Sequence, residues 1–201
     1  MLFPRVFLSA LSVLIVVFVD ANTLPENSTS VAPSPDLFPI SAVGNIAAVQ
    51  LSATADTRIF FQDSTGAIME GGVTAGKDLG TSVLVPANQV LPFTPIFAIN
   101  DPTATSYLIR LYFFSPENTL SEYIYPTTIP QNTNGFMGGP SCTACLTTQG
   151  IVGRSGSQVL YALANPAFTQ FRVGFISAGQ PTTVSEAVNT GAGWQVSTIP
   201  N

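Results

Sequence analysis

From residue 40 onward, the sequence alternates short apolar runs with small groups of glycine, proline, asparagine and aspartate. The runs are rich in β-branched and aromatic residues, and no 3.6-residue periodicity persists along them. Short runs closed by turn residues are typical of strands, whereas amphipathic helices need a sustained period. The pattern therefore predicts an all-β fold.

The apolar runs recur as three repeats. Each repeat starts with a strand of small and apolar residues. A second strand follows, whose first residue is an arginine, and after a turn comes a glutamate. The first strands cover residues 46–49, 96–99 and 160–163. The arginines are Arg58, Arg110 and Arg172, and the glutamates that follow them are Glu70, Glu122 and Glu186. The glutamates lie 12, 12 and 14 residues after their arginines.

This spacing indicates a hairpin with the arginine and the glutamate on one face. Residues equidistant from the centre of an antiparallel turn lie opposite each other. With turn centres at Ser64 and Pro116, the partners of the first two repeats are expected directly opposite one another. Because side chains alternate between faces with a period of two, the even spacing keeps both partners on the same side of the sheet.

The repeats predict four-stranded blades. Four strands in roughly 40–50 residues is the size of a β-propeller blade. We expect about three four-stranded antiparallel repeats in a domain of residues 41–201, with units at about 41–92, 93–152 and 153–201. The fourth strand of the second unit is expected near residues 146–152.

The N-terminal residues are expected to lie outside this fold. Arg5 precedes an apolar run at residues 6–19, which is shorter than the about 20 residues that span a bilayer. We interpret residues 1–21 as a secretory signal peptide, with an N-terminal membrane anchor as the alternative. Residues 22–40 read as an extended leader rich in proline, in which Asn27 is a candidate N-glycosylation site. The expected location is extracellular.

Charge is scarce in this sequence. Only 8% of the residues are charged, six are lysine or arginine, and histidine is absent, which gives a formal net charge of −5. An acidic chain with few bases has no electrostatic footprint for nucleic acid or for an anionic membrane surface. Without histidine there is no serine–histidine–aspartate catalysis and no histidine-ligated metal. We therefore expect no nucleic-acid partner, no membrane partner after signal cleavage and no cofactor.

The two cysteines, Cys142 and Cys145, are separated by two residues. This spacing can form a redox pair, but no helix pattern follows it and the chain is expected to be secreted. A small disulfide that tightens a loop is the favoured interpretation, with a redox role as the alternative. Two thiolates do not fill a tetrahedral zinc site, so no metal is expected.

The repeat resembles the fungal fucose-specific lectins, which are six-bladed β-propellers. The resemblance is carried by residues 95–98, 109–113 and 118–123 in the second unit, and by residues 58–63 with Glu70 in the first. It covers about residues 40–198 and is loosest in the third unit. It implies a secreted, non-catalytic carbohydrate-binding protein whose partners are fucosylated or related glycans.

The resemblance also implies roles for individual residues. The arginine and the glutamate of each repeat would hold a sugar ring by hydrogen bonds, because a guanidinium is a rigid fork of donors and a carboxylate is an acceptor. An aromatic side chain would support the apolar face of the sugar, with Tyr112 and Trp194 as candidates. The family carries a tryptophan a few residues after each glutamate, whereas this chain has only Trp194. Arg110 and Glu122 are expected to form the most credible site.

Other interpretations of the same residues stay open. An arginine opposite a glutamate is also a common cross-strand ion pair, so a degenerate propeller without sugar affinity would fit, serving as a structural or cell-surface interaction protein. A glycosidase fits poorly, because each carboxylate is paired with an arginine rather than with a second carboxylate. Three blades are fewer than the four to eight of a propeller. We expect a homodimer that closes a six-bladed ring, with an open arc as the alternative.

Overall fold

The computed structural model describes residues 42–51, 56–74, 77–101, 108–125 and 135–199. The expected signal peptide, the leader and Asn27 lie outside the described residues. The described residues belong to one compact unit. No helix among the described residues is long and apolar enough to cross a membrane.

The described residues contain three four-stranded antiparallel sheets, which confirms the predicted all-β blades. The strands follow chain order within each sheet, so every sheet is a meander. Blade 1 consists of β1 (Ala42–Gln50), β2 (Thr57–Asp63), β3 (Ile68–Thr74) and β4 (Lys77–Val85). Blade 2 consists of β5 (Phe97–Asn100), β6 (Ile109–Phe114), β7 (Leu120–Tyr125) and β8 (Met137–Gly138). Blade 3 consists of β9 (Leu160–Ala164), β10 (Phe171–Ile176), β11 (Val184–Asn189) and β12 (Trp194–Thr198).

Each blade has two faces, because successive side chains of a strand point to opposite sides. We call the face that carries the repeat arginine the front face, and the other one the back face. The front face of blade 1 packs on the back face of blade 2 in a core that includes Phe60 and Leu111. The front face of blade 2 packs in the same way on the back face of blade 3, where Tyr112 meets Val173.

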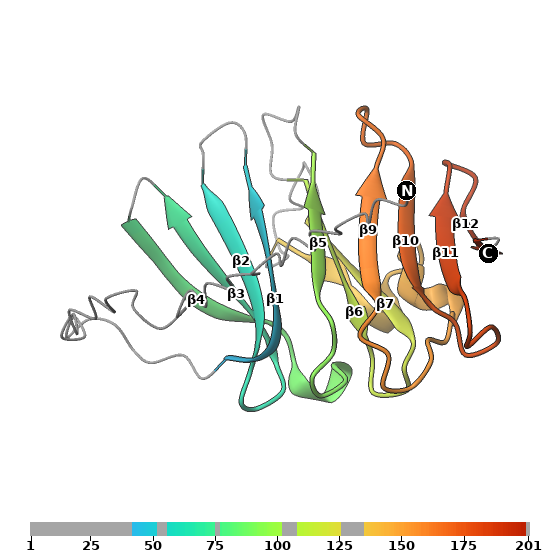
Figure 1. The fold of residues 1–201 in the computed structure, drawn as a ribbon. Coiled ribbons are helices and arrows are strands. Elements are labelled where there is room, and N and C mark those ends of the chain that lie inside the picture. The colour runs from blue at the N-terminus through green and yellow to red at the C-terminus, as the bar shows by residue number, and fades with distance from the viewer. Residues whose placement is uncertain (1–41, 52–55, 75–76, 102–107, 126–134, 200–201) are drawn as a thin grey trace, which may run out of the picture. The chain divides into compact units, whose positions relative to one another are not determined.

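The first strands of the three blades are neighbours in space: β1 lies beside β5, and β5 lies beside β9 (Figure 1). A cavity of about 680 Å³ is lined by residues of all three strands. One alanine of the repeat recurs on the back face of these strands. Ala98 and Ala162 are only 9% and 2% exposed, whereas Ala48 is exposed. The contrast arises because a preceding blade covers blades 2 and 3, but no described blade covers the back of blade 1.

Blade 2 departs from the repeat at its outer edge, where we expected a strand near residues 146–152. Only the end of that segment pairs, through an isolated bridge between Val152 and Thr119, while residues 146–149 form a 3₁₀ helix. The fourth strand of blade 2, β8, has only two residues, and the chain then forms the 3₁₀ helices η2 (Gly139–Ser141) and η3 (Leu146–Gln149). A disulfide joins Cys142 to Cys145 between them, as predicted. The chain turns here because Glu122 of β7 binds the start of η3, accepting the backbone N–H of Leu146.

Candidate functional site

Every repeat arginine forms an ion pair with the glutamate of its own repeat, on the front face of its own blade. The pairs are Arg58–Glu70 (Nη1 to Oε1, 3.4 Å), Arg110–Glu122 (Nη1 to Oε1, 2.6 Å) and Arg172–Glu186 (Nε to Oε2, 2.9 Å). The sequence therefore predicted the partners correctly.

The partners are diagonal neighbours rather than directly opposite residues, which corrects the expected register. Glu70 lies opposite Phe60, two residues beyond Arg58 on β2. The centre of the turn falls one residue later than expected, at Thr65, whose backbone N–H and hydroxyl both donate to the Asp63 carboxylate. A shift of one residue in the centre moves the pairing by two, so both side chains stay on the same face.

The same two-residue offset recurs in the other blades. Tyr112 lies opposite Glu122, and Gly174 lies opposite Glu186. In the third repeat the longer spacing is taken up by a longer turn between β10 and β11. A diagonal position across an antiparallel pair is within reach of a long side chain such as arginine. The three ion pairs therefore share one backbone geometry.

The Arg58–Glu70 pair is partly exposed, with 26% of the arginine side chain and 18% of the glutamate side chain accessible. Gly72, directly opposite Arg58, leaves room for the guanidinium, since a Cβ there would lie 3.0 Å from Nη1. Burial raises the pKa of the Glu70 carboxyl, and the charge of Arg58 offsets only part of this rise.

The Arg110–Glu122 pair is enclosed. Glu122 is 0% exposed, with Oε1 bonded to Arg110 and Oε2 accepting the N–H of Leu146 at 2.8 Å. The Arg110 guanidinium carbon lies 3.8 Å from the ring centroid of Phe171 in blade 3, a cation–π contact. The pair that we expected to form the most credible site is thus the least accessible one, because η3 and blade 3 cover it.

The Arg172–Glu186 pair lies on the front face of blade 3, where no described blade covers it. Arg172 is 56% exposed and Glu186 is 6% exposed. Arg172 donates to Oε2 through both Nε and Nη2, and the Tyr161 hydroxyl donates to Oε1 at 2.7 Å. Burial alone would raise the pKa of Glu186, but the hydrogen bonds from Arg172 and Tyr161 outweigh it and lower the pKa. Glu186 is therefore an ionised, fixed acceptor at neutral pH.

Tyr161 is a member of this cluster that the sequence analysis missed. It lies on β9 directly opposite Gly174, and its ring fills the space above that glycine, where a Cβ would come within 2.0 Å of a ring carbon. Burial and the hydrogen bond to Glu186 raise the pKa of Tyr161 to about 12. The available signal was the glycine itself, which stands where the other repeats have Phe60 and Tyr112.

The two aromatic residues predicted from the sequence lie elsewhere. Tyr112 is completely buried between blades 2 and 3, and burial, followed by the charge of Glu122, raises its pKa well above the usual range. Trp194 packs against the same core cluster. Since Glu186 pairs with Ser197, strand alternation puts Trp194 on the back face of blade 3. Neither ring flanks the exposed pair of blade 3.

The exposed pair offers donors and an acceptor side by side. A guanidinium has five N–H donors in a planar fork, and in the described structure Arg172 gives two of them to Glu186. The others are available to a ligand, and the Tyr161 ring beside them adds apolar area. Such a set suits neighbouring hydroxyl groups on a ring with an apolar face.

Meander blades with adjacent first strands define the class of fold as that of β-propeller blades. Among solved structures, the chain is similar to AofleA from Arthrobotrys oligospora, with a TM-score of 0.64 and 20% identity, and to the Aleuria aurantia lectin in complex with Fucα1-6GlcNAc, with a TM-score of 0.59 and 24% identity. The matches cover 80% of this chain but only 43% and 50% of those chains. These similarities confirm the resemblance to the fungal fucose-specific lectins at the level of the fold.

A third similar structure is matched over its whole length. A fucose lectin from Kordia zhangzhouensis, solved with methyl-fucoside, matches with a TM-score of 0.53 and 14% identity. The match covers 78% of this chain and 100% of that chain. No protein-family model matches the sequence, and neither does any curated protein.

Proposed function

We propose that this chain is a secreted, non-catalytic carbohydrate-binding protein that holds a neutral sugar between an arginine and a glutamate of its repeats. The observation that carries the proposal is the Arg172–Glu186–Tyr161 cluster, which presents free guanidinium donors, a fixed carboxylate and an aromatic ring on an exposed face. Fucose is the first sugar to test, because two of the similar proteins are a lectin in complex with Fucα1-6GlcNAc and a fucose lectin in complex with methyl-fucoside.

The three pairs are unequal candidates. The pairs of blades 1 and 3 keep part of the arginine and of the glutamate accessible. Glu122, by contrast, has no exposed surface, because η3 lies against its carboxylate and Phe171 of blade 3 lies against its arginine. Arg110 and Glu122 therefore support the packing of blades 2 and 3, whereas Arg58 and Arg172 are the residues proposed to contact a sugar.

Binding without catalysis agrees with the pairing of charges. Each carboxylate of the three pairs contacts an arginine, whereas a glycosidase needs two carboxyl groups about 5–10 Å apart around the scissile bond. Glu186 is held ionised by its partners, which is the wrong state for a general acid.

The test is retention of the mature protein on fucose-agarose and its elution with free fucose. We expect Arg172→Ala to weaken fucose binding about tenfold or more at its site, because it removes charge-assisted hydrogen bonds. Titration calorimetry on wild type and on this variant measures the loss and the number of sites. Arg154→Ala is the matched control, since Arg154 is an exposed arginine that contacts the Pro181 carbonyl instead of a glutamate.

The competing function is a propeller without sugar affinity that serves as a structural or cell-surface interaction protein. The enclosed Arg110–Glu122 pair favours it, because there the same motif acts within the core. Folded wild-type protein that neither binds the resin nor gives heat with fucose or with a panel of other neutral monosaccharides would support this alternative.

We also propose that two copies pair to close a ring of six blades. The back face of blade 1 and the front face of blade 3 are open, and they belong to the same two types of face that pack together inside the chain. Ile46 on the first face is 61% exposed and Leu163 on the second is 56% exposed. Their counterparts at the inner interfaces are covered: Ile96 is 5% exposed and Val49 is 7% exposed.

A further inference from the structure

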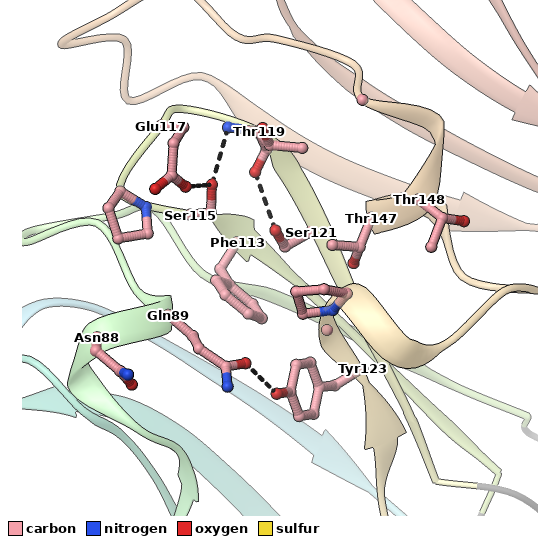
Figure 2. Close-up of a pocket in the computed structure, with 14 residues that line it drawn as sticks. Asn88, Gln89, Phe113, Ser115, Glu117, Thr119, Ser121, Tyr123, Thr147 and Thr148 are labelled. Atoms are coloured by element: carbon pink, nitrogen blue, oxygen red, sulfur yellow. Dashed lines mark hydrogen bonds between the residues drawn. The ribbon is translucent and has the colours of Figure 1, made fainter.

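A second cavity lies on blade 2, and the Arg–Glu pairs play no part in it (Figure 2). It has a volume of about 530 Å³, within the range of about 300–1,000 Å³ that is usual for small-molecule sites. Ser121 and Tyr123 of β7 line it, whereas Glu122 between them points to the front face, where it pairs with Arg110. The cavity is therefore on the back face of blade 2, on the other side of the strand from Glu122.

The cavity exists because blade 2 departs from the repeat. Its walls come from the link η1 (Ala87–Gln89), from the β6–β7 hairpin, and from η2 and η3 on either side of the disulfide. In blades 1 and 3 the fourth strand has nine and five residues, whereas in blade 2 it has two and is followed by these helices. The cavity is thus an addition to blade 2 rather than a property of the repeat.

The polar groups of the cavity are held in place before any ligand arrives. The Tyr123 hydroxyl donates to Oε1 of Gln89 at 2.8 Å, which orients the glutamine (Figure 2). The Gln89 amide nitrogen makes no hydrogen bond to any residue that the structure describes. Gly139, with φ of 69°, allows this close approach, because a Cβ there would lie 3.0 Å from Oε1 of Gln89. A preorganised donor of this kind lowers the ordering cost of binding.

The lining specifies the chemistry of a ligand. The tilted rings of Phe113 and Tyr123 form the floor of the cavity, with their centroids 5.7 Å apart. Both residues also belong to the core and are 1% and 9% exposed, and hydroxyl and amide groups surround them. Among the residues that the structure describes, no lysine or arginine lines the cavity. The Glu117 carboxylate, which is part of the described lining, is exposed at the hairpin turn and accepts a hydrogen bond from the Ser115 hydroxyl. An aromatic floor within neutral donors and acceptors favours an uncharged, hydroxyl-rich ring over an anion or a cation.

We propose that this cavity is a second binding site for a neutral, polyhydroxylated ring such as a sugar residue, with Gln89 as its principal donor and Phe113 and Tyr123 as its floor. The site is independent of the Arg–Glu pairs, so it binds its ligand without a guanidinium. A failure of sugar binding at the Arg–Glu pairs would not contradict this second site, and the reverse also holds.

The experiment follows ¹⁵N-labelled full-length protein by NMR during titration. The signals are those of the Gln89 side-chain amide and of the Ser121 and Tyr123 backbone amides, and every variant retains the latter two. The probes are the methyl glycosides of fucose, galactose, mannose and N-acetylglucosamine, each raised to about 20 mM, well above the Kd of about 1 mM that marks a weak site. At least one probe is expected to shift these signals in a saturable way. Arg58→Ala and Arg172→Ala are expected to leave that titration unchanged.

Two variants and a control test the assignment. Gln89→Met removes the donor and should weaken binding about tenfold, the effect of one lost hydrogen bond of about 1.4 kcal/mol. Asn88→Phe places a ring at the mouth from an exposed lining position and should block binding while the protein stays folded. Gln149→Met makes the same change on η3 outside the cavity and should have no effect. The proposal is overturned if no probe shifts the Gln89 signals, or if Gln89→Met and Asn88→Phe bind as tightly as Gln149→Met.

Discussion

At the scale of single residues, blade 3 differs from blades 1 and 2 in the strand that supplies the aromatic ring beside the glutamate. Blades 1 and 2 place Phe60 and Tyr112 opposite their glutamates, and both rings are buried. Blade 3 has Gly174 there instead, and the ring above it comes from Tyr161 on β9. The exchange brings a phenol hydroxyl to Glu186 and leaves the ring partly accessible.

We predict that Gly174→Ala destabilises the protein by about 2 kcal/mol, within the usual range for an overpacked site. The new Cβ would lie 2.0 Å from the Tyr161 ring, so the ring must swing away and release Glu186. Denaturant unfolding measures the loss. Gly179→Ala is the control, because its nearest neighbour is a side-chain oxygen at 3.8 Å, and it should unfold like wild type. Equal stability of the two variants would contradict this account.

The sequence identified the six charged residues of the motif, but it did not reveal their surroundings. Spacing alone determines that Arg110 and Glu122 share a face, because alternation has a period of two. Whether that face is open depends on Phe171 and Leu146, which come from another blade and from η3. Residues distant in the sequence leave no trace in the spacing of a repeat, so the least accessible pair looked like the best one.

At the scale of elements, the outer edge of blade 2 shows where pattern-based prediction fails. Residues 146–152 contain apolar residues between turn formers, which is typical of a strand, yet residues 146–149 form η3. Two hydrogen bonds of Glu122 favour the helix. Its buried carboxylate accepts the backbone N–H of Leu146, and its own backbone N–H donates to the Thr147 hydroxyl. Burying the carboxylate without these partners would lower the stability of the fold by several kcal/mol, which exceeds the free energy of any local strand preference.

We predict that breaking the disulfide loosens η3 from Glu122. The bridge closes a loop of four residues that ends immediately before Leu146, so in Cys142→Ser the N–H of Leu146 is no longer held at the carboxylate. Because the loop is so short, loss of the disulfide is expected to lower the free energy of unfolding by about 2 kcal/mol. Hydrogen exchange should accelerate at the Leu146 amide and stay unchanged at Val173 in the core. Thr143→Ala, an exposed change in the same loop, is the control.

Unchanged exchange at Leu146 in Cys142→Ser would show that η3 is held by its other contacts alone. The readout is specific to the element, because global unfolding would accelerate Val173 together with Leu146. The same comparison can be made on the wild-type protein before and after reduction.

At the scale of the whole molecule, the proposed ring predicts a dimer in solution. Light scattering on the mature protein should give twice the mass of one chain. Leu163→Asp and Ile46→Asp place a charge on one or the other open face and should each produce monomers. Val196→Asp is the matched control, since Val196 is 50% exposed but lies on β12 at the outer edge of blade 3. A wild-type monomer at micromolar concentration would contradict the ring.

The shared two-residue offset also means that the three ion pairs can be compared with one another inside one molecule. Backbone geometry is held constant, while the hydrogen-bond complement of the carboxylate changes from blade to blade. Among the described residues, Glu70 has one hydrogen-bond donor, Arg58 at 3.4 Å, and a raised pKa, whereas Glu186 has donors on both oxygens and a lowered pKa. Differences in how the Glu70 and Glu186 carboxyls titrate therefore report on local solvation and hydrogen bonding with the backbone register held constant. Comparisons of ion pairs taken from unrelated proteins do not allow that separation.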